Sequence, residues 1–296
     1  MKARRRITAW SAVLLVPALI WPALPLGSAL AEDTDISPVP VMTEWTAAMI
    51  GALEITHTPP PPAMRVGAIV QASVFDAVDG ITRRYDPFHV HTAAPRNALP
   101  AAAAAGAAHE ALSALFPSQA ASFDTLLAAT LARLADDEEQ DSEAIRRGVT
   151  WGATVADTIL AWRAGDGFTA VPPPYQPTDT PGRWQPTPPL FGPPAFRQFA
   201  SMTPFAINSP SQFLPPAPPP LASARYAQDF AEVKTLGSAT SSLRSPFDGQ
   251  TALLWQSHAP VAIWDRVADT LINTRHLRLT DAARLLAQTN SPWPTR

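Results

Sequence analysis

The sequence predicts an all-α fold: a helical bundle wrapped by an extended proline-rich segment. Apolar residues recur at spacings of three and four over most of the chain, which is the period of an amphipathic α-helix. Segments that alternate between apolar and polar residues are too few for a sheet, and no internal repeat is visible. Proline is abundant, and half of the 34 prolines lie within residues 171–220.

Residues 1–31 have the composition of a secretory signal peptide. Lys2 and three arginines form a basic start, an apolar stretch covers residues 7–26, and Ser28-Ala29-Leu30-Ala31 is a cleavage sequence. A membrane anchor is the weaker interpretation, because three prolines interrupt a run that is already short for a bilayer. Arg4-Arg5 also permits a twin-arginine route. We expect an exported chain, periplasmic or secreted, with no stable membrane span after cleavage.

The composition limits the possible partners and chemistry. About 265 residues remain after cleavage, enough for one large domain. A net charge of −3 gives no reason to expect nucleic acid or an anionic membrane as a partner. Cysteine is absent, which excludes disulfides and thiol chemistry.

Residues 32–170 are predicted to form a helical bundle. The expected helices cover residues 41–57, 63–84, 99–115, 119–135 and 142–163. Pro59-Pro60-Pro61-Pro62 should separate the first two, and Ser118 should cap the fourth. The second has one apolar face, with Arg65, Asp79 and Arg83 on the opposite face.

Two short segments bound the fifth helix. The four carboxylates from Asp136 to Glu139 have no histidine nearby, so a solvated cap that favours the next helix is a better interpretation than a metal site. Gly165-Asp166-Gly167 should end the helix.

Residues 171–222 form the proline-rich segment. Its large aromatics are too many for a disordered linker, and they are Tyr175, Trp184, Phe191, Phe196, Phe199, Phe205 and Phe213. We predict an ordered, extended segment that wraps the bundle, with these aromatics held in surface grooves. A ligand for an SH3-type domain is the alternative, and an exported protein would rarely meet such a partner.

Helices resume over residues 223–290 as a continuation of the same domain. Ser223 should cap a helix that ends before Gly237, and a helical stretch from Pro246 to His276 should break at Pro260. Thr280 should cap a last helix. Residues 291–296 then replace the helical pattern with Ser-Pro-Trp-Pro-Thr-Arg, and we expect this tail to be non-native and the chain to stop inside a fold.

The residues show no catalytic constellation. His89 and His91 lack a third metal ligand at useful spacing, so a pair in a surface loop is the better interpretation. His109 reads as a helix-face residue with its hydrogen bonds satisfied. His258 and Asp265 have compatible types for an acid–base pair, but nothing beside them activates a nucleophile. Nucleophile-elbow and glycine-rich phosphate motifs are missing.

From Arg65-Val66-Gly67-Ala68-Ile69-Val70 to Ala283-Arg284-Leu285, the order of segments resembles bacterial vanadium-dependent haloperoxidase-like proteins, which belong to the type 2 phosphatidic acid phosphatase superfamily. The similarity starts at Arg65-Val66-Gly67-Ala68-Ile69-Val70-Gln71-Ala72-Ser73-Val74-Phe75-Asp76-Ala77-Val78-Asp79-Gly80-Ile81 and covers about 220 residues. It continues through Ala107-Ala108-His109-Glu110, Leu115-Phe116-Pro117, Gly152-Ala153-Thr154-Val155-Ala156, Arg163-Ala164-Gly165-Asp166-Gly167, Gly182-Arg183-Trp184, Met202-Thr203-Pro204-Phe205, Glu232-Val233-Lys234 and Ala283-Arg284-Leu285.

The resemblance implies an all-helical bundle that binds vanadate, or phosphate in the phosphatase relatives, among several fixed cations and one histidine. Its site motifs are a Lys before an Arg-Pro, a Pro-Ser-Gly-His, and a Ser-Arg followed by the ligand His. The family places all three beyond the point where this chain ends. Ser-Gly does not occur in the sequence, and Lys234 with Arg244-Ser245-Pro246 does not reproduce the first motif.

We therefore assign no catalytic, cofactor-binding or metal-binding residue, and we expect no cofactor in this chain. The predicted function is a truncated haloperoxidase or acid-phosphatase-like protein, inactive by itself, whose parent reaction is halide oxidation by peroxide or phosphate-ester hydrolysis of a small molecule. The alternative is an exported, non-catalytic helical binding or scaffold module. A homo-oligomer is possible for either.

Overall fold

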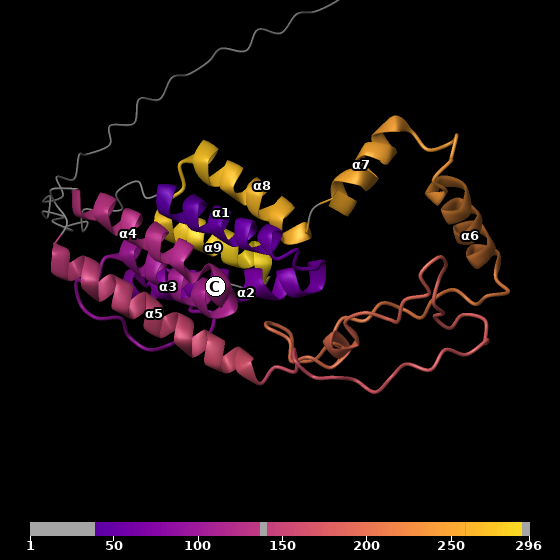
Figure 1. The fold of residues 1–296 in the computed structure, drawn as a ribbon, viewed down its shortest axis with the longest axis horizontal. Helices are drawn as coiled ribbons and strands as arrows, with labels where there is room; N and C mark the ends of the chain where they lie inside the picture. The colour runs from indigo at the N-terminus through magenta and orange to yellow at the C-terminus, as the bar shows by residue number, and fades with distance from the viewer. Residues whose placement is uncertain (1–38, 137–140, 258, 292–296) are drawn as a thin grey trace, which may run out of the picture. The chain divides into compact units, whose positions relative to one another are not determined.

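The computed structural model describes residues 39–136, 141–257 and 259–291. Within these ranges the regular elements are nine α-helices and two short 3-10 helices, so the predicted all-α class is confirmed (Figure 1). Residues 1–31 lie outside the described ranges, and so do the tail after Ser291 and three of the four carboxylates from Asp136 to Glu139.

Helix α2 (Pro60–Thr82) is the centre of the bundle. It packs against α3 (Pro100–Leu115), α5 (Ser142–Ala164), α8 (Pro260–Arg275) and α9 (Leu279–Asn290). Side chains all around it are buried, including Asp79. The prediction of a polar face carrying Arg65 and Asp79 is therefore wrong, because Asp166 covers Arg65 and the loop after α2 covers Asp79. Arg83 alone of the three is exposed.

The prolines between α1 (Val39–Ile55) and α2 act differently from the prediction. Pro59 occupies the N-cap position and α2 begins at Pro60. Proline suits a first helical turn because the N–H that it lacks has no partner there and its fixed φ is helical. The proline run therefore starts a helix, where the sequence had suggested only a separator.

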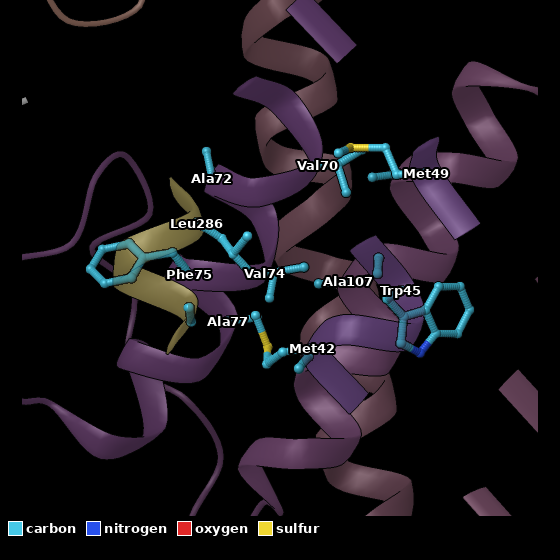
Figure 2. Close-up of a cluster of buried hydrophobic side chains, with 14 of the residues drawn as sticks. Met42, Trp45, Met49, Val70, Ala72, Val74, Phe75, Ala77, Ala107 and Leu286 are labelled. Carbon is cyan, nitrogen blue, oxygen red and sulfur yellow. The ribbon is translucent and has the colours of Figure 1, made fainter. Parts of the chain in front are cut away.

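The core is formed by apolar side chains of several helices. Figure 2 shows Met42 and Trp45 from α1, Phe75 from α2 and Leu286 from α9 within one buried cluster. The three-and-four spacing predicted these inward faces correctly. The fully buried Ala102–Ala105 run of α3 contributes small side chains that let other helices approach.

Helices α3 and α5 have the most extensive contact in the bundle. Glycines make this approach possible: a Cβ at Gly152 would lie 2.1 Å from the Ala103 carbonyl oxygen, and one at Gly148 would lie 2.5 Å from that of Leu99. A Cβ at Gly106 would meet the Val149 carbonyl at 2.5 Å. Gly106 of α3 and Gly148 and Gly152 of α5 therefore let the two helix backbones come into contact.

Two predicted caps are replaced by other contacts. Ser118 lies inside a 3-10 turn (Pro117–Gln119) that precedes α4 (Ala120–Asp136), so it does not occupy the cap position. Thr280 lies inside α9, where its hydroxyl donates to Thr82 of α2 over 3.2 Å. The predicted cap at Ser223 is confirmed, because its hydroxyl accepts from the Tyr226 N–H at the start of α6 (Ala224–Gly237).

The proline-rich segment is extended, with one 3-10 turn at Arg197–Ala200. Phe205 packs against the core of the bundle, as expected for an aromatic held in a groove. Trp184, Phe191 and Phe213 are exposed, so the prediction that all seven aromatics are held in grooves is wrong for these three. The prolines prevent a backbone ladder or helix that would hold these rings in place.

Helices α6 and α7 (Pro246–Ser257) follow this segment. The expected break before Pro260 is present, where α8 begins. Neither α6 nor α7 makes an extensive contact with another helix of the described chain. A search of the described residues finds no helix long and apolar enough to cross a membrane.

Candidate functional site

The most polar buried place in the bundle is a cluster around Arg163, at the C-terminal end of α5. The Arg163 side chain is 1% exposed, and its Nε and Nη2 donate to Oδ2 of Asp166 over 3.1 and 2.9 Å. Arg65 of α2 donates its Nε to the same oxygen over 2.8 Å. One carboxylate therefore joins two guanidinium groups from two helices.

Backbone carbonyls accept from further donors of this Arg163 cluster. Arg163 donates to the carbonyls of Thr203 and Pro204 over 2.5 and 3.2 Å, and Arg65 donates to the carbonyl of Arg163 over 2.9 Å. In return the Thr203 N–H donates to the carbonyl of Asp166 over 2.8 Å. These bonds fasten the proline-rich segment to the end of α5.

Aromatic rings close the cluster on its other sides. The Arg163 guanidinium lies 3.9 Å from the ring centre of Phe205 and 4.6 Å from that of Trp162. Arg65 lies 4.5 Å from the ring centre of Phe168. The His89 ring stacks on the ring of Trp162, with ring centres 4.1 Å apart. Such cation–π contacts strengthen where water is excluded.

The charges of the cluster follow from these contacts. Burial opposes ionisation of Asp166, but hydrogen bonds from Arg65, the Phe168 N–H and Arg163 outweigh it and hold the pKa of this carboxyl below its ordinary value. Burial lowers the pKa of Arg163, with Asp166 acting against it. Burial, His91 and Arg163 lower the pKa of His89. At neutral pH two guanidinium ions share one carboxylate beside a mainly neutral imidazole.

The Arg163 cluster does not fit a vanadate or phosphate ion. Such an ion carries two or three negative charges and needs several fixed donors directed at it. Here Asp166 already occupies the position between the two guanidinium groups, and two carbonyl oxygens and the Phe205 ring lie against Arg163. The geometry is that of a structural clamp between α2, α5 and the proline-rich segment.

A second polar region lies where α2 meets the loop that follows it. Asp76 accepts from the N–H groups of Phe88, His89 and Val90 over 2.6 to 2.8 Å. Burial raises the pKa of Asp76 to about 6, with these three bonds acting against it. Asp79 likewise accepts from the loop backbone, and burial raises its pKa. Both carboxylates hold the loop on the bundle.

This loop borders an open pocket of about 310 Å³. Its lining includes Asp79, Tyr85, Arg83 and His91. Arg83 and His91 are exposed side chains, and Asp79 is engaged with the loop backbone. One permanent cation at the surface is too little charge to hold an oxyanion with two or three negative charges.

The histidines named in the sequence analysis have different surroundings. His109 contacts Asp124 over 2.7 Å, which confirms the interpretation of a satisfied helix-face residue. His89 and His91 share a loop, and no group of three histidine, aspartate or glutamate side chains suited to a metal occurs in the part of the chain that the structure describes. His258 lies outside that part, so the pair with Asp265 is not described.

Asp265 has a different environment from the one expected. It is fully buried on α8, and its Oδ1 accepts from Asn290 of α9 over 2.7 Å, while its Oδ2 has no hydrogen-bond partner among the described residues. Burial raises the pKa of Asp265 to about 7, with the Asn290 hydrogen bond acting against the rise and Asp269, one turn later, adding to it. Burial also raises the pKa of Asp269 to about 7. The buried Asp265 and the half-buried Asp269 therefore both resist ionisation.

The comparisons with known proteins bear on the fold. No protein-family model and no curated protein matches the chain. Among solved structures, a bacterial vanadium-dependent iodoperoxidase has a TM-score of 0.71 and 21% sequence identity over 85% of this chain. At this identity the likeness establishes a shared, haloperoxidase-like fold. The match covers 65% of the iodoperoxidase chain, so this chain spans less than two thirds of its length.

Proposed function

We propose that the chain is the N-terminal helical part of a vanadium-dependent haloperoxidase or acid-phosphatase-like protein of the type 2 phosphatidic acid phosphatase superfamily, and that by itself it is inactive. The observation that carries this proposal is the fold shared with an iodoperoxidase over 85% of this chain but only 65% of the other. The order of family-like segments in the sequence supports the superfamily assignment.

The described cations near the buried site and the pocket do not form an oxyanion cage. Halide oxidation or phosphate-ester hydrolysis on this fold needs an oxyanion held among fixed positive charges. Arg65 and Arg163 are committed to Asp166 and to backbone carbonyls, and Arg83 is a single exposed arginine in the lining of the open pocket. We propose that the anion-binding motifs belong to a part of the fold that this sequence does not contain.

An activity assay tests this proposal. The purified chain is supplied with vanadate, peroxide and either bromide or iodide, and separately with a chromogenic phosphate ester. We expect no turnover above a protein-free control in either assay. Turnover that disappears when vanadate is omitted, or phosphatase activity that co-purifies with the chain, would contradict the proposal.

We also propose that the chain is exported. The basic start, the apolar stretch and Ser28-Ala29-Leu30-Ala31 support removal of residues 1–31 and a periplasmic or secreted location. Expression in a bacterial host followed by N-terminal sequencing of the exported fraction is the test. The expected first residue is Glu32, and a chain that stays intact in the cytoplasm would contradict it.

A non-catalytic binding or scaffold module is the second candidate. Its specific support is the apolar surface on α6 and α8, where Phe230, Val233 and Trp264 are more than half exposed. The DNA beyond the last codon separates the two candidates. A reading frame that encodes Pro-Ser-Gly-His and a Ser-Arg followed by His favours the haloperoxidase assignment, and its absence favours the scaffold.

A further inference from the structure

Helix α6 presents an apolar stripe to solvent. Tyr226, Phe230 and Val233 follow one another at spacings of four and three, and Leu236 continues the row. The four side chains are between 36% and 71% exposed. An isolated helix of 14 residues is marginal in water, so a stable α6 needs another surface over this stripe.

Helix α8 presents a second stripe of the same kind. Its inner side is fastened to the bundle, with Val261, Asp265 and Ile272 buried. Its outer side carries Trp264, Val267 and Leu271, which are 42% to 51% exposed and spaced by three and four. The stripe is therefore rigidly positioned and about half exposed, and the ring of Trp264 lies 6.1 Å from that of Trp255 on α7.

The amount of apolar surface is that of a protein interface. The two stripes hold seven large side chains, each exposing roughly 100 Å² because it is about half exposed. The sum of roughly 700 Å² is close to the roughly 800 Å² that each partner buries in a standard interface.

The charge around the stripes favours a neutral partner. Helix α6 carries Arg225, Asp229, Glu232 and Lys234, which sum to zero, and Arg225 pairs with Asp229 over 2.8 Å. The cation Arg266 of α8 pairs with Glu54 of α1. A surface for a strongly charged partner would show one sign. A second copy of the chain meets no net repulsion here.

We propose that the chain forms a two-fold dimer in which the α6 stripe of each copy covers the α8 stripe of the other. In a two-fold interface, residue i of one copy contacts residue j of the other, and j contacts i. Two different stripes of one chain can therefore form the same contact twice in the dimer. The spacing of both stripes suits helix-on-helix packing. Each dimer then covers two α6–α8 pairs.

Sedimentation equilibrium of the chain without residues 1–31 tests the proposal, since this chain keeps every described residue from Val39 onward. We expect a dimer. Phe230→Asp on α6 and Val267→Asp on α8 each disrupt both α6–α8 contacts of the dimer. Each variant should weaken association by at least about tenfold. Asn273→Asp, at an exposed α8 position away from the stripe, is the matched control and should dimerise as the wild type does.

Mixing the two variants tests the pairing itself. A mixed dimer of Phe230→Asp with Val267→Asp keeps one intact α6–α8 pair, so the mixture should associate more tightly than either variant alone. Pairing of α6 with α6 and of α8 with α8 leaves no intact pair and predicts no recovery. Circular dichroism of each variant must show wild-type helix content.

Several outcomes would overturn the proposal. One is a wild-type monomer at roughly 100 μM, a concentration at which interfaces of standard size normally associate. Another is a series of assemblies that grow with concentration and do not close as a dimer. A third is that the Phe230→Asp and Val267→Asp variants dimerise as the wild type does. A monomer whose α6 amides resist hydrogen exchange would show that α6 folds back on its own α8.

Discussion

Gly152 offers the sharpest test of how the bundle is held together. A Cβ at this position would lie 2.1 Å from the Ala103 carbonyl oxygen and 2.7 Å from the Ala107 nitrogen. Both are backbone atoms of α3, so no side-chain rotation relieves the clash, and α3 and α5 must move apart. Overpacking of this kind costs typically about 1–3 kcal/mol, and the gain in helix propensity from glycine to alanine returns about 1 kcal/mol.

Because the clash is with backbone, we expect Gly152→Ala to fall at the upper end, with a net loss of about 2 kcal/mol in the free energy of unfolding. Gly51 is the matched control, since a Cβ there meets nothing within 4 Å in the middle of α1. Gly51→Ala should stabilise the chain by about 0.5–1 kcal/mol.

Urea unfolding followed by far-UV circular dichroism measures both changes, and the midpoint should shift without a change in slope. In thermal unfolding the Gly152→Ala midpoint should fall by roughly 4–8 °C, at about 2–4 °C per kcal/mol for a domain of this size. The reasoning is refuted if Gly152→Ala is as stable as the wild type while Gly51→Ala behaves as expected.

Three further substitutions have expected outcomes. Asp166→Asn leaves two buried guanidinium ions without their carboxylate and should cost about 3–5 kcal/mol in urea unfolding at pH 7, with the cost shrinking as the pH falls through the depressed pKa of Asp166. Asp265 has its pKa raised from 3.8 to about 7, so the folded chain holds a proton that the unfolded chain has lost, and stability falls by about 1.4 kcal/mol per pH unit between about pH 4 and 7. Asp265→Asn keeps an oxygen to accept from Asn290 and should remove this contribution from the slope of a stability–pH profile, while Asp76 and Asp269, whose pKa values are also raised, keep theirs; a slope unchanged from the wild type would contradict the assignment. Ser223→Ala removes the α6 cap and should cost about 1 kcal/mol of α6 stability, seen as faster amide exchange in α6 alone.

The helices could be predicted from the sequence because their apolar period is set by local geometry. The inward faces of α1 and α2, the break before Pro260 and the cap at Ser223 all follow from residues within one or two turns. The start of α2 at Pro60 was missed, although the preference of proline for a first helical turn was a local signal for it.

The buried polar groups could not be predicted in the same way. Arg65 and Asp166 are 101 positions apart in the chain, and no local pattern shows that they share a hydrogen bond. Asp79 has the sequence position of a solvent-facing residue and is buried because the loop after α2 folds back over it. Tertiary contacts overrode helical periodicity at these positions.

The central claim is that the buried cations of this haloperoxidase-like fold are committed to Asp166 and hold no oxyanion. Urea unfolding with and without orthovanadate tests it most directly, because a ligand that binds only the folded chain stabilises it by mass action. We expect the same free energy of unfolding at every vanadate concentration. A stabilisation that grows by about 1.4 kcal/mol for each tenfold increase in vanadate, and that Arg163→Met abolishes, would contradict the claim.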